Sequence, residues 1–138
     1  MDDIVKKHLI REEGFHQIPY VDSKGIPTVG IGHNIAIKQS KEIVWALYEN
    51  DEKKTIEYLD FYLGWWRGLD ESRQKALFVM CFQMGIDSLR GFKKMLKALE
   101  AGNYRESYKE ALDSKWFRED SPGRAKRVAK IFLSGKFK

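Results

Sequence analysis

Residues 10–33 read I-R-E-E-G-F-H-Q-I-P-Y-V-D-S-K-G-I-P-T-V-G-I-G-H, and this stretch decides the fold. A short helical pattern ends there at Glu13 and Gly14, where glycine is the usual exit residue. Two β-prone pieces follow at 18–21 and 28–31, and the turn sequence D-S-K-G between them predicts a hairpin. The chain therefore changes here from helix to a small β structure.

Three side chains of this stretch suit acid–base chemistry. Glu13 lies where the negative end of a helix dipole favours a carboxyl group that keeps its proton. Asp22 and Thr28 place a second acid and a hydroxyl on the hairpin, and hydrolysis of a glycosidic bond uses two carboxyl groups across a cleft. Each residue also has an ordinary interpretation, as a surface acid, a turn residue and a strand residue. Spacing alone leaves these alternatives open.

Outside this stretch the apolar spacing is helical. It predicts helices over residues 2–13, 40–62, 70–84, 88–101, 104–112 and 123–133, with a tight turn or short helix at 114–118. We expect an α+β, mostly helical fold with two lobes in one domain, 1–138. A small β lobe spans about 14–39, a connector helix about 40–63, and the helical lobe takes 1–13 and 65–138.

Composition narrows the class of protein. With 138 residues and 43% hydrophobic residues the chain can build one compact domain, and no apolar run approaches the roughly 18 residues of a membrane span. The acidic N-terminus, M-D-D, does not resemble a secretory signal. Cys81 is the single cysteine and is expected in the core, as is the pair Trp65–Trp66. Three scattered histidines predict neither a metal nor another cofactor.

The net charge of +5 is concentrated near the C-terminus. Residues 102–138 hold ten Lys and Arg against five Asp and Glu, whereas residues 1–101 are balanced. Such a basic surface favours an anionic partner, namely nucleic acid, an acidic membrane or a charged wall polymer. A surface that only confers solubility is the alternative.

Several motifs together resemble one known family. The order E, eight residues, D, five residues, T, then G-I-G-H is similar to the phage-type, T4-like lysozymes and endolysins. F-Q-M-G at 82–85, G-F at 91–92, S-K-W-F at 114–117 and P-G-R-A-K-R-V at 122–128 follow in the family's order. The resemblance covers most of the chain and implies a lysozyme-like fold.

The resemblance also implies a reaction and the residues that perform it. Glu13 would be the general acid that protonates the leaving glycosidic oxygen. Asp22 would stay ionised and position the attacking water, which Thr28 would hold from the other side. The family is regarded as inverting, and its substrate is the β-1,4 bond between N-acetylmuramic acid and N-acetylglucosamine in bacterial peptidoglycan.

Further residues take supporting roles by the same resemblance. Phe82 and Gln83 would line the cleft and bind sugar. Alternatively, the Gln83 side chain hydrogen-bonds to the backbone of the helical lobe. Arg124 would reach the catalytic glutamate, Glu13. The alternative interpretation is that Arg124 is an ordinary surface charge. His33 would pair with Asp51 and tie the β lobe to the connector helix.

Two departures from the family pattern stand out. Only residues 34–39 separate His33 from the helix start at Ser40, so the β lobe is shortened and its sugar contacts are reduced. The segment 115–121 is about one residue longer than its counterpart, and no role is assigned there.

Other functions compete with hydrolysis. A lysozyme-like module could bind cell wall without cutting it, and a lytic transglycosylase would use one acid and no water. A nucleic-acid binder is disfavoured by the balanced charge over residues 1–101. We therefore expect peptidoglycan as partner, no nucleic acid, no transmembrane segment and a monomer. The protein would be made without a signal peptide in a bacterial host's cytoplasm during phage growth. It would reach the wall through a membrane lesion or within a larger particle.

Overall fold

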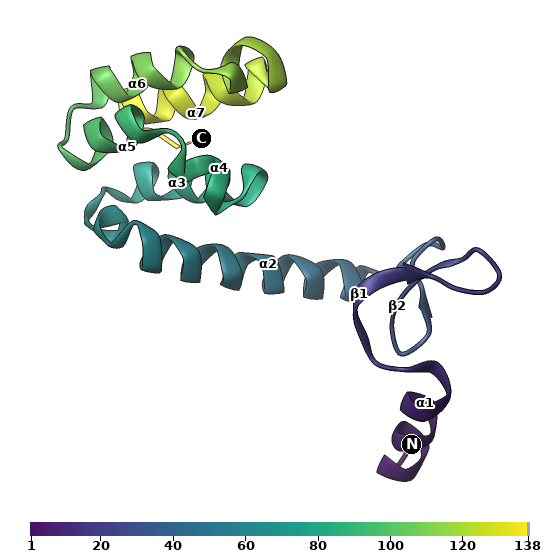
Figure 1. Ribbon diagram of the computed structural model, residues 1–138. Coiled ribbons are helices and arrows are strands. Elements are labelled where there is room, and N and C mark those ends of the chain that lie inside the picture. The colour runs from purple at the N-terminus through teal and green to yellow at the C-terminus, as the bar shows by residue number, and fades with distance from the viewer. Residues whose placement is uncertain (138) are drawn as a thin grey trace. The chain divides into compact units, whose positions relative to one another are not determined.

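The computed structural model describes residues 1–137 and is α+β, as predicted (Figure 1). Its α-helices are α1 Asp3–Glu13, α2 Lys41–Tyr62, α3 Glu71–Met84, α4 Ile86–Arg90, α5 Lys93–Glu100, α6 Tyr104–Leu112 and α7 Pro122–Ser134. Its strands are β1 His16–Val21, β2 Pro27–Gly30 and β3 His33–Asn34. A 3-10 turn, η1 Gly64–Gly68, and a π turn, η2 Trp116–Asp120, complete the described elements.

The chain divides into two compact units, Met1–Ala46 and the part from Leu47 onward. The boundary falls inside the connector helix α2. Helix α1 contributes no buried residue. The expected grouping of residues 1–13 with the helical lobe stays a prediction.

The first unit is a capped helix followed by a small antiparallel sheet. Asp2 caps α1 by accepting a hydrogen bond from the Val5 amide at 3.1 Å, which satisfies one of the free N–H groups of the first turn. The strands lie in the order β1-β2-β3, and Thr28 in the central strand is opposite Tyr20 on one side and Asn34 on the other. The predicted hairpin is therefore present, with a third, two-residue strand added.

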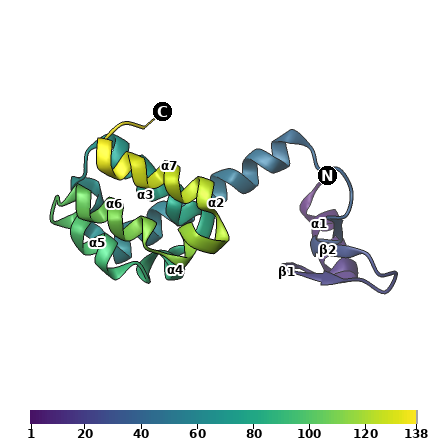
Figure 2. The ribbon, with the colours of Figure 1, turned by 90° about the horizontal axis from the view of Figure 1, so that it is seen from above.

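The second unit is built around a hydrophobic core between helices. Helices α5, α6 and α7 pack side by side in it, and α7 also contacts α3 (Figure 2). Leu77 and Met80 of α3 and Phe132 of α7 are fully buried. Trp66 is buried and Trp65 packs against the core, as expected for this pair.

Cys81 is buried as well, which confirms its predicted place in the core. Burial raises the pKa of its thiol to about 11, because a thiolate is poorly solvated among apolar side chains. The sulfur therefore stays protonated at neutral pH and acts as a small apolar group.

One predicted helix is wrong in its extent. Instead of a continuous helix over 88–101, the chain forms α4 and α5 with a break at Gly91 and Phe92. Phe92 leaves the helical region with φ −80° and ψ 55°. Its ring stands edge-on to Trp116, with the ring centres 6.0 Å apart. This contact between segments distant in sequence accompanies the break between α4 and α5. The local spacing of apolar residues does not reveal that break.

Asp60 joins the end of α2 to the turn that follows. Its Oδ1 accepts hydrogen bonds from Trp66 Nε1 and Arg67 Nε, both at 2.8 Å, and its Oδ2 accepts from Arg67 Nη2 at 3.0 Å. The hydrogen bonds from Arg67 and then from Trp66 hold the pKa of Asp60 below its usual value.

A first prediction concerns the core. We expect Leu77→Ala to lower the free energy of unfolding by about 2–5 kcal/mol, because it removes a fully buried side chain and leaves a cavity. Leu133→Ala is the matched control, since Leu133 is 43% exposed and should lose much less. Denaturant unfolding of both variants measures the difference, and equal losses would contradict this core assignment.

A second prediction concerns pH. Because the pKa of Asp60 is lowered in the folded state, its stabilising effect is complete above the unfolded value of about 3.9. The effect is lost as pH falls through the folded value. We expect Asp60→Asn to be less stable than wild type at neutral pH, with the two converging once the pH has fallen below the folded-state pKa of Asp60. The exposed acid Glu57, changed to Gln, is the control, and a difference that persists in acid would refute the idea.

Candidate functional site

The carboxyl group of Glu13 lies directly against the backbone of Gly32. A Cβ atom placed on Gly32 would be 2.8 Å from Glu13 Oε2 and 3.0 Å from its Cδ. Gly32 also has a φ of +68°, which favours glycine. The end of α1 and the turn between β2 and β3 therefore meet at this point, and position 32 has both a steric and a conformational reason to lack a side chain.

Asp22 is held by the turn that it begins. Its Oδ1 accepts hydrogen bonds from the amides of Lys24 at 2.8 Å and Ile26 at 2.9 Å, the pattern by which aspartate stabilises a turn. No partner for Oδ2 occurs in the chain up to residue 137. One oxygen thus fixes the side chain, and the other remains able to accept a hydrogen bond.

Thr28 is tied to Asp22 through one peptide group. The carbonyl oxygen of Ile26 accepts both the Thr28 hydroxyl at 2.8 Å and the Asp22 amide at 3.0 Å. Thr28 is only 3% exposed, and because its own hydrogen is donated to Ile26, its oxygen is left as an acceptor. The register places Thr28 opposite Tyr20, so that these two side chains share a face of the sheet, and Asp22 comes directly after the end of β1.

His33 finds its partner within the shortened segment. His33 Nε2 lies 2.6 Å from Gln39 Oε1, and the Gln39 amide nitrogen donates to the carbonyls of Asn34 at 3.2 Å and Ile37 at 2.8 Å. Gln39 was not singled out by the sequence, because nothing local marks it. The predicted pair with Asp51 would join the two units and stays a prediction.

The remaining predicted site residues lie in the second unit. Gln83 and Arg124 line one small pocket of about 150 Å³. The Gln83 side chain makes no hydrogen bond within residues 1–137, so a hydrogen bond from it to the backbone is not found there. The approach of Arg124 to Glu13 concerns both units and stays a prediction.

Phe82 belongs to an aromatic row that the sequence did not reveal. Its ring centre lies 5.7 Å from that of Tyr48 and 5.9 Å from that of Phe78. Phe82 is 37% exposed, and with Asp51 it lines a second pocket of about 190 Å³. The row leaves a partly open aromatic face, which is suited to stacking on a sugar ring.

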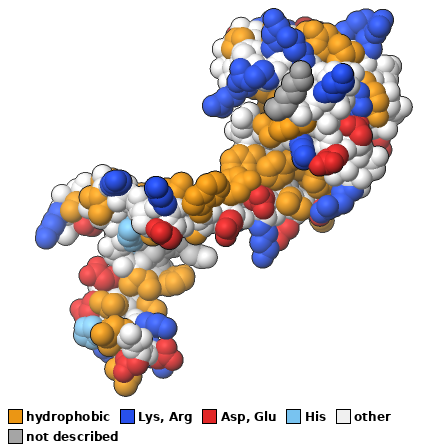
Figure 3. Space-filling view, turned by 180° about the vertical axis from the view of Figure 1, so that it is seen from behind, with side chains coloured by type: hydrophobic (Ala, Val, Ile, Leu, Met, Phe, Trp, Pro, Cys, Tyr) orange, Lys and Arg blue, Asp and Glu red, His pale blue; other side chains and the backbone are white. Residues whose placement is uncertain are grey.

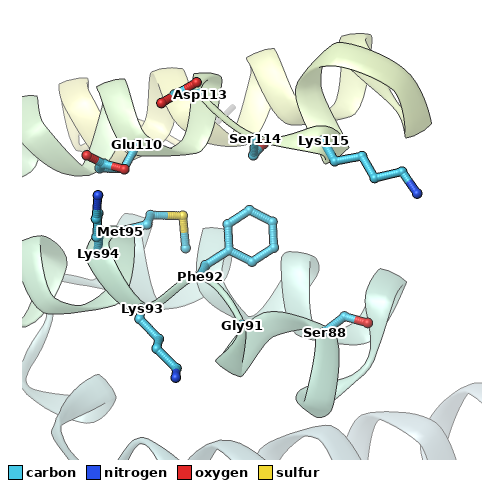
Figure 4. A pocket seen from close by; sticks show the side chains of 10 residues that line it. All are labelled: Ser88, Gly91, Phe92, Lys93, Lys94, Met95, Glu110, Asp113, Ser114 and Lys115. Carbon is cyan, nitrogen blue, oxygen red and sulfur yellow. The ribbon is translucent and has the colours of Figure 1, made fainter.

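A larger pocket lies apart from all of these residues. It measures about 470 Å³, and Figure 4 shows it between the α4–α5 segment and the α6–η2 segment. Phe92 and Met95 occupy its middle, and Lys94 faces Glu110 at one end. None of the predicted site residues lines it.

Residues 1–137 contain no group of three or more His, Cys, Asp or Glu side chains that could hold a metal ion. None of the helices described in this range is both long and apolar enough to cross a membrane.

Comparison with known proteins assigns the family. The family model described as phage lysozyme matches residues 10–130, which include Glu13, Asp22 and Thr28. The chain belongs to the phage lysozyme family. Membership supports a lysozyme-type cell-wall hydrolase, a glycoside hydrolase, and it confirms the resemblance to T4-like lysozymes.

Curated relatives agree with this family. The chain is 33% identical to the pre-baseplate central spike protein Gp5 of Enterobacteria phage T4, over 92% of this chain and 27% of that protein. It therefore spans about a quarter of the length of the spike protein. Two Dictyostelium discoideum proteins, "Probable T4-type lysozyme 1" and "Probable T4-type lysozyme 2", are 29% and 30% identical. Those matches cover 95% and 97% of this chain, and 94% and 96% of the relatives.

A third prediction compares two glycines of this phage lysozyme site. Gly30 and Gly32 have φ values of +69° and +68°, but a Cβ on Gly30 meets nothing within 4 Å. We expect Gly30→Ala and Gly32→Ala to carry the same backbone strain of about 1–2 kcal/mol. Only Gly32→Ala should also displace the Glu13 carboxyl and abolish release of soluble fragments from purified cell wall. Equal activity of the two variants at equal folded fraction would refute the contact.

Proposed function

We propose that this chain is a peptidoglycan hydrolase that cleaves the β-1,4 bond between N-acetylmuramic acid and N-acetylglucosamine. The observation that carries the proposal is the joint fixation of Asp22 and Thr28 by the Ile26 peptide, in a phage lysozyme whose Glu13 lies against the following turn. An acid, a carboxylate and a hydroxyl acceptor are the groups that hydrolysis with one water requires.

In the proposed reaction Glu13 donates its proton to the glycosidic oxygen as the bond to the anomeric carbon breaks. Asp22, ionised, accepts a hydrogen bond from the attacking water through Oδ2 and takes up the proton that the water loses. The Thr28 oxygen accepts the other water hydrogen and fixes its direction. The water attacks the face opposite the leaving group, so the configuration at the anomeric carbon is inverted.

Residues of the second unit supply binding in this proposal. Phe82 would stack on a sugar, and Gln83 would hydrogen-bond to it with an amide that has no partner within residues 1–137. Arg124 would orient Glu13, and a pair between His33 and Asp51 would link the two units. The short segment 34–39 would offer fewer sugar contacts than a longer β lobe.

We further propose that the chain meets peptidoglycan in the setting of phage growth. The similarity to a spike protein of phage T4 supports a place either as a free enzyme or as part of a larger particle. Synthesis in a host cytoplasm and action on the wall after release are part of the same proposal.

A fourth prediction tests the chemistry. Mass spectrometry of purified peptidoglycan digested by wild type should reveal fragments with ordinary reducing ends, and Glu13→Gln should release none. Glu12→Gln is the matched control, because it removes the same charge from the preceding exposed residue of α1 and should keep activity.

The other outcomes point elsewhere. Anhydro ends on the muramic sugar would replace hydrolysis by lytic transglycosylation. Wall binding without fragments from either protein would favour the second candidate, a non-catalytic wall-binding module, which the short segment 34–39 keeps in consideration. Loss of activity in Glu12→Gln equal to that in Glu13→Gln would remove the special role of Glu13.

A further inference from the structure

Helix α7 differs from its neighbours in charge. It carries Arg124, Lys126, Arg127 and Lys130 and no acidic residue. The adjacent helix α6 carries two cations and two acids. The salt bridges described within residues 1–137 involve none of the four α7 cations, although they do pair five other Lys or Arg side chains. The positive charge of α7 is therefore not neutralised by a salt bridge within residues 1–137.

These cations lie on the outer side of a helix that is anchored in the core. Ala125, Val128, Ala129 and Phe132 are buried and hold α7 against the helical unit. Arg127, Lys130 and Ser134 are exposed and recur at spacings of three and four, so they form one outward stripe, and Ile131 beside them is half-buried against the core. The stripe is rigid because the buried face of the same helix fixes its direction.

A shallow pocket follows this stripe and combines charge with apolar surface. It measures about 460 Å³ and is lined by Arg127, Lys130 and Lys136 with Ile131, Leu133 and Ser134. No acidic side chain lines this pocket. The smaller pocket that shares Arg127 with it has no acidic lining residue either. Leu133 and Phe137 are 43% and 41% exposed.

The view from behind shows the same combination on the surface. Lys and Arg side chains lie beside hydrophobic ones on the helical unit, and α7 is on this side of the unit (Figures 2 and 3). A soluble polyanion would need the cations alone. The added apolar surface at the same place fits a ligand that carries a negative head group and a hydrocarbon part.

We propose that the α7 face, defined by Arg127, Lys130 and Leu133 of the helix and by Lys136 just after it, binds the surface of a membrane that contains anionic phospholipids. The cations contact lipid phosphates, and Leu133 enters the boundary between head groups and acyl chains. Because the buried face of α7 stays in the core, insertion is shallow and binding is reversible and sensitive to salt. This inference does not depend on the proposed hydrolysis.

The fifth prediction uses the full chain and vesicles. Wild type should float with vesicles of equal parts phosphatidylglycerol and phosphatidylcholine, and not with phosphatidylcholine alone. Arg127→Gln combined with Lys130→Gln should weaken binding about tenfold or more, since each cation near an anionic surface contributes substantially. Circular dichroism of the exposed-site variants checks that they remain folded.

Two controls separate a local site from general attraction. Lys97→Gln combined with Lys109→Gln removes the same charge from exposed positions on α5 and α6 and should keep most of the binding. Leu133→Gln keeps every charge and should still lower binding. Equal losses in the two double variants, or no binding by wild type, would overturn the proposal. If Leu133→Gln binds vesicles fully and inorganic polyphosphate competes completely with the vesicles, the proposal is overturned in favour of a site for soluble polyanions.

Discussion

The unit Met1–Ala46 has almost no apolar core, and this constraint governs the candidate site. All residues of this unit are described by the structure, and Thr28 is the one buried residue among them. The side chains of the candidate site are therefore positioned by backbone geometry. The peptide of Ile26 joins Asp22 to Thr28, and the absence of a side chain at Gly32 gives Glu13 its place. Where packing is sparse, hydrogen bonds and turn conformations supply the order.

This mode of positioning leaves the two carboxyl groups in different situations. Asp22 uses one oxygen for two backbone amides, so its side chain is fixed while the other oxygen can still accept a hydrogen bond. Glu13 is exposed at the end of α1 and is limited by contact with Gly32. A fixed carboxylate and an accessible acid are complementary requirements for hydrolysis, in which one group orients water while the other delivers a proton to the substrate.

The second unit uses ordinary packing, and this leaves its surface free for charge. Helix α7 meets the core through Ala125, Val128, Ala129 and Phe132, while its outer side carries cations without acids. The Arg73 side chain adds hydrogen bonds to the carbonyls of Phe132 and Leu133 at the end of this helix, and none of these attachments uses Arg127 or Lys130. The composition of the outer face is therefore available for recognition of an anionic surface, whether in the cell wall or in a membrane.

The local elements follow from the sequence because their signals are local. Asp2 and Asp70 mark helix starts, Gly14 and Gly85 mark helix ends, and D-S-K-G marks the hairpin turn. The helix at 104–112 is found as predicted, and the family that the motifs predict is confirmed by a match over residues 10–130. Caps, turns and periodicity act over a few residues, so that one sequence suffices to read them.

Tertiary structure alone decided the contacts between segments. The break before α5 accompanies the packing of Phe92 on Trp116, and His33 lies against Gln39. Local residue spacing predicts neither of these two contacts. The contact of Glu13 with Gly32 likewise depends on how the chain returns after two strands. Such pairs are chosen by the path of the whole backbone, and the alternation of polar and apolar residues carries no information about them. The sequence therefore determined the family and most of the local elements, and the fold decided which groups meet.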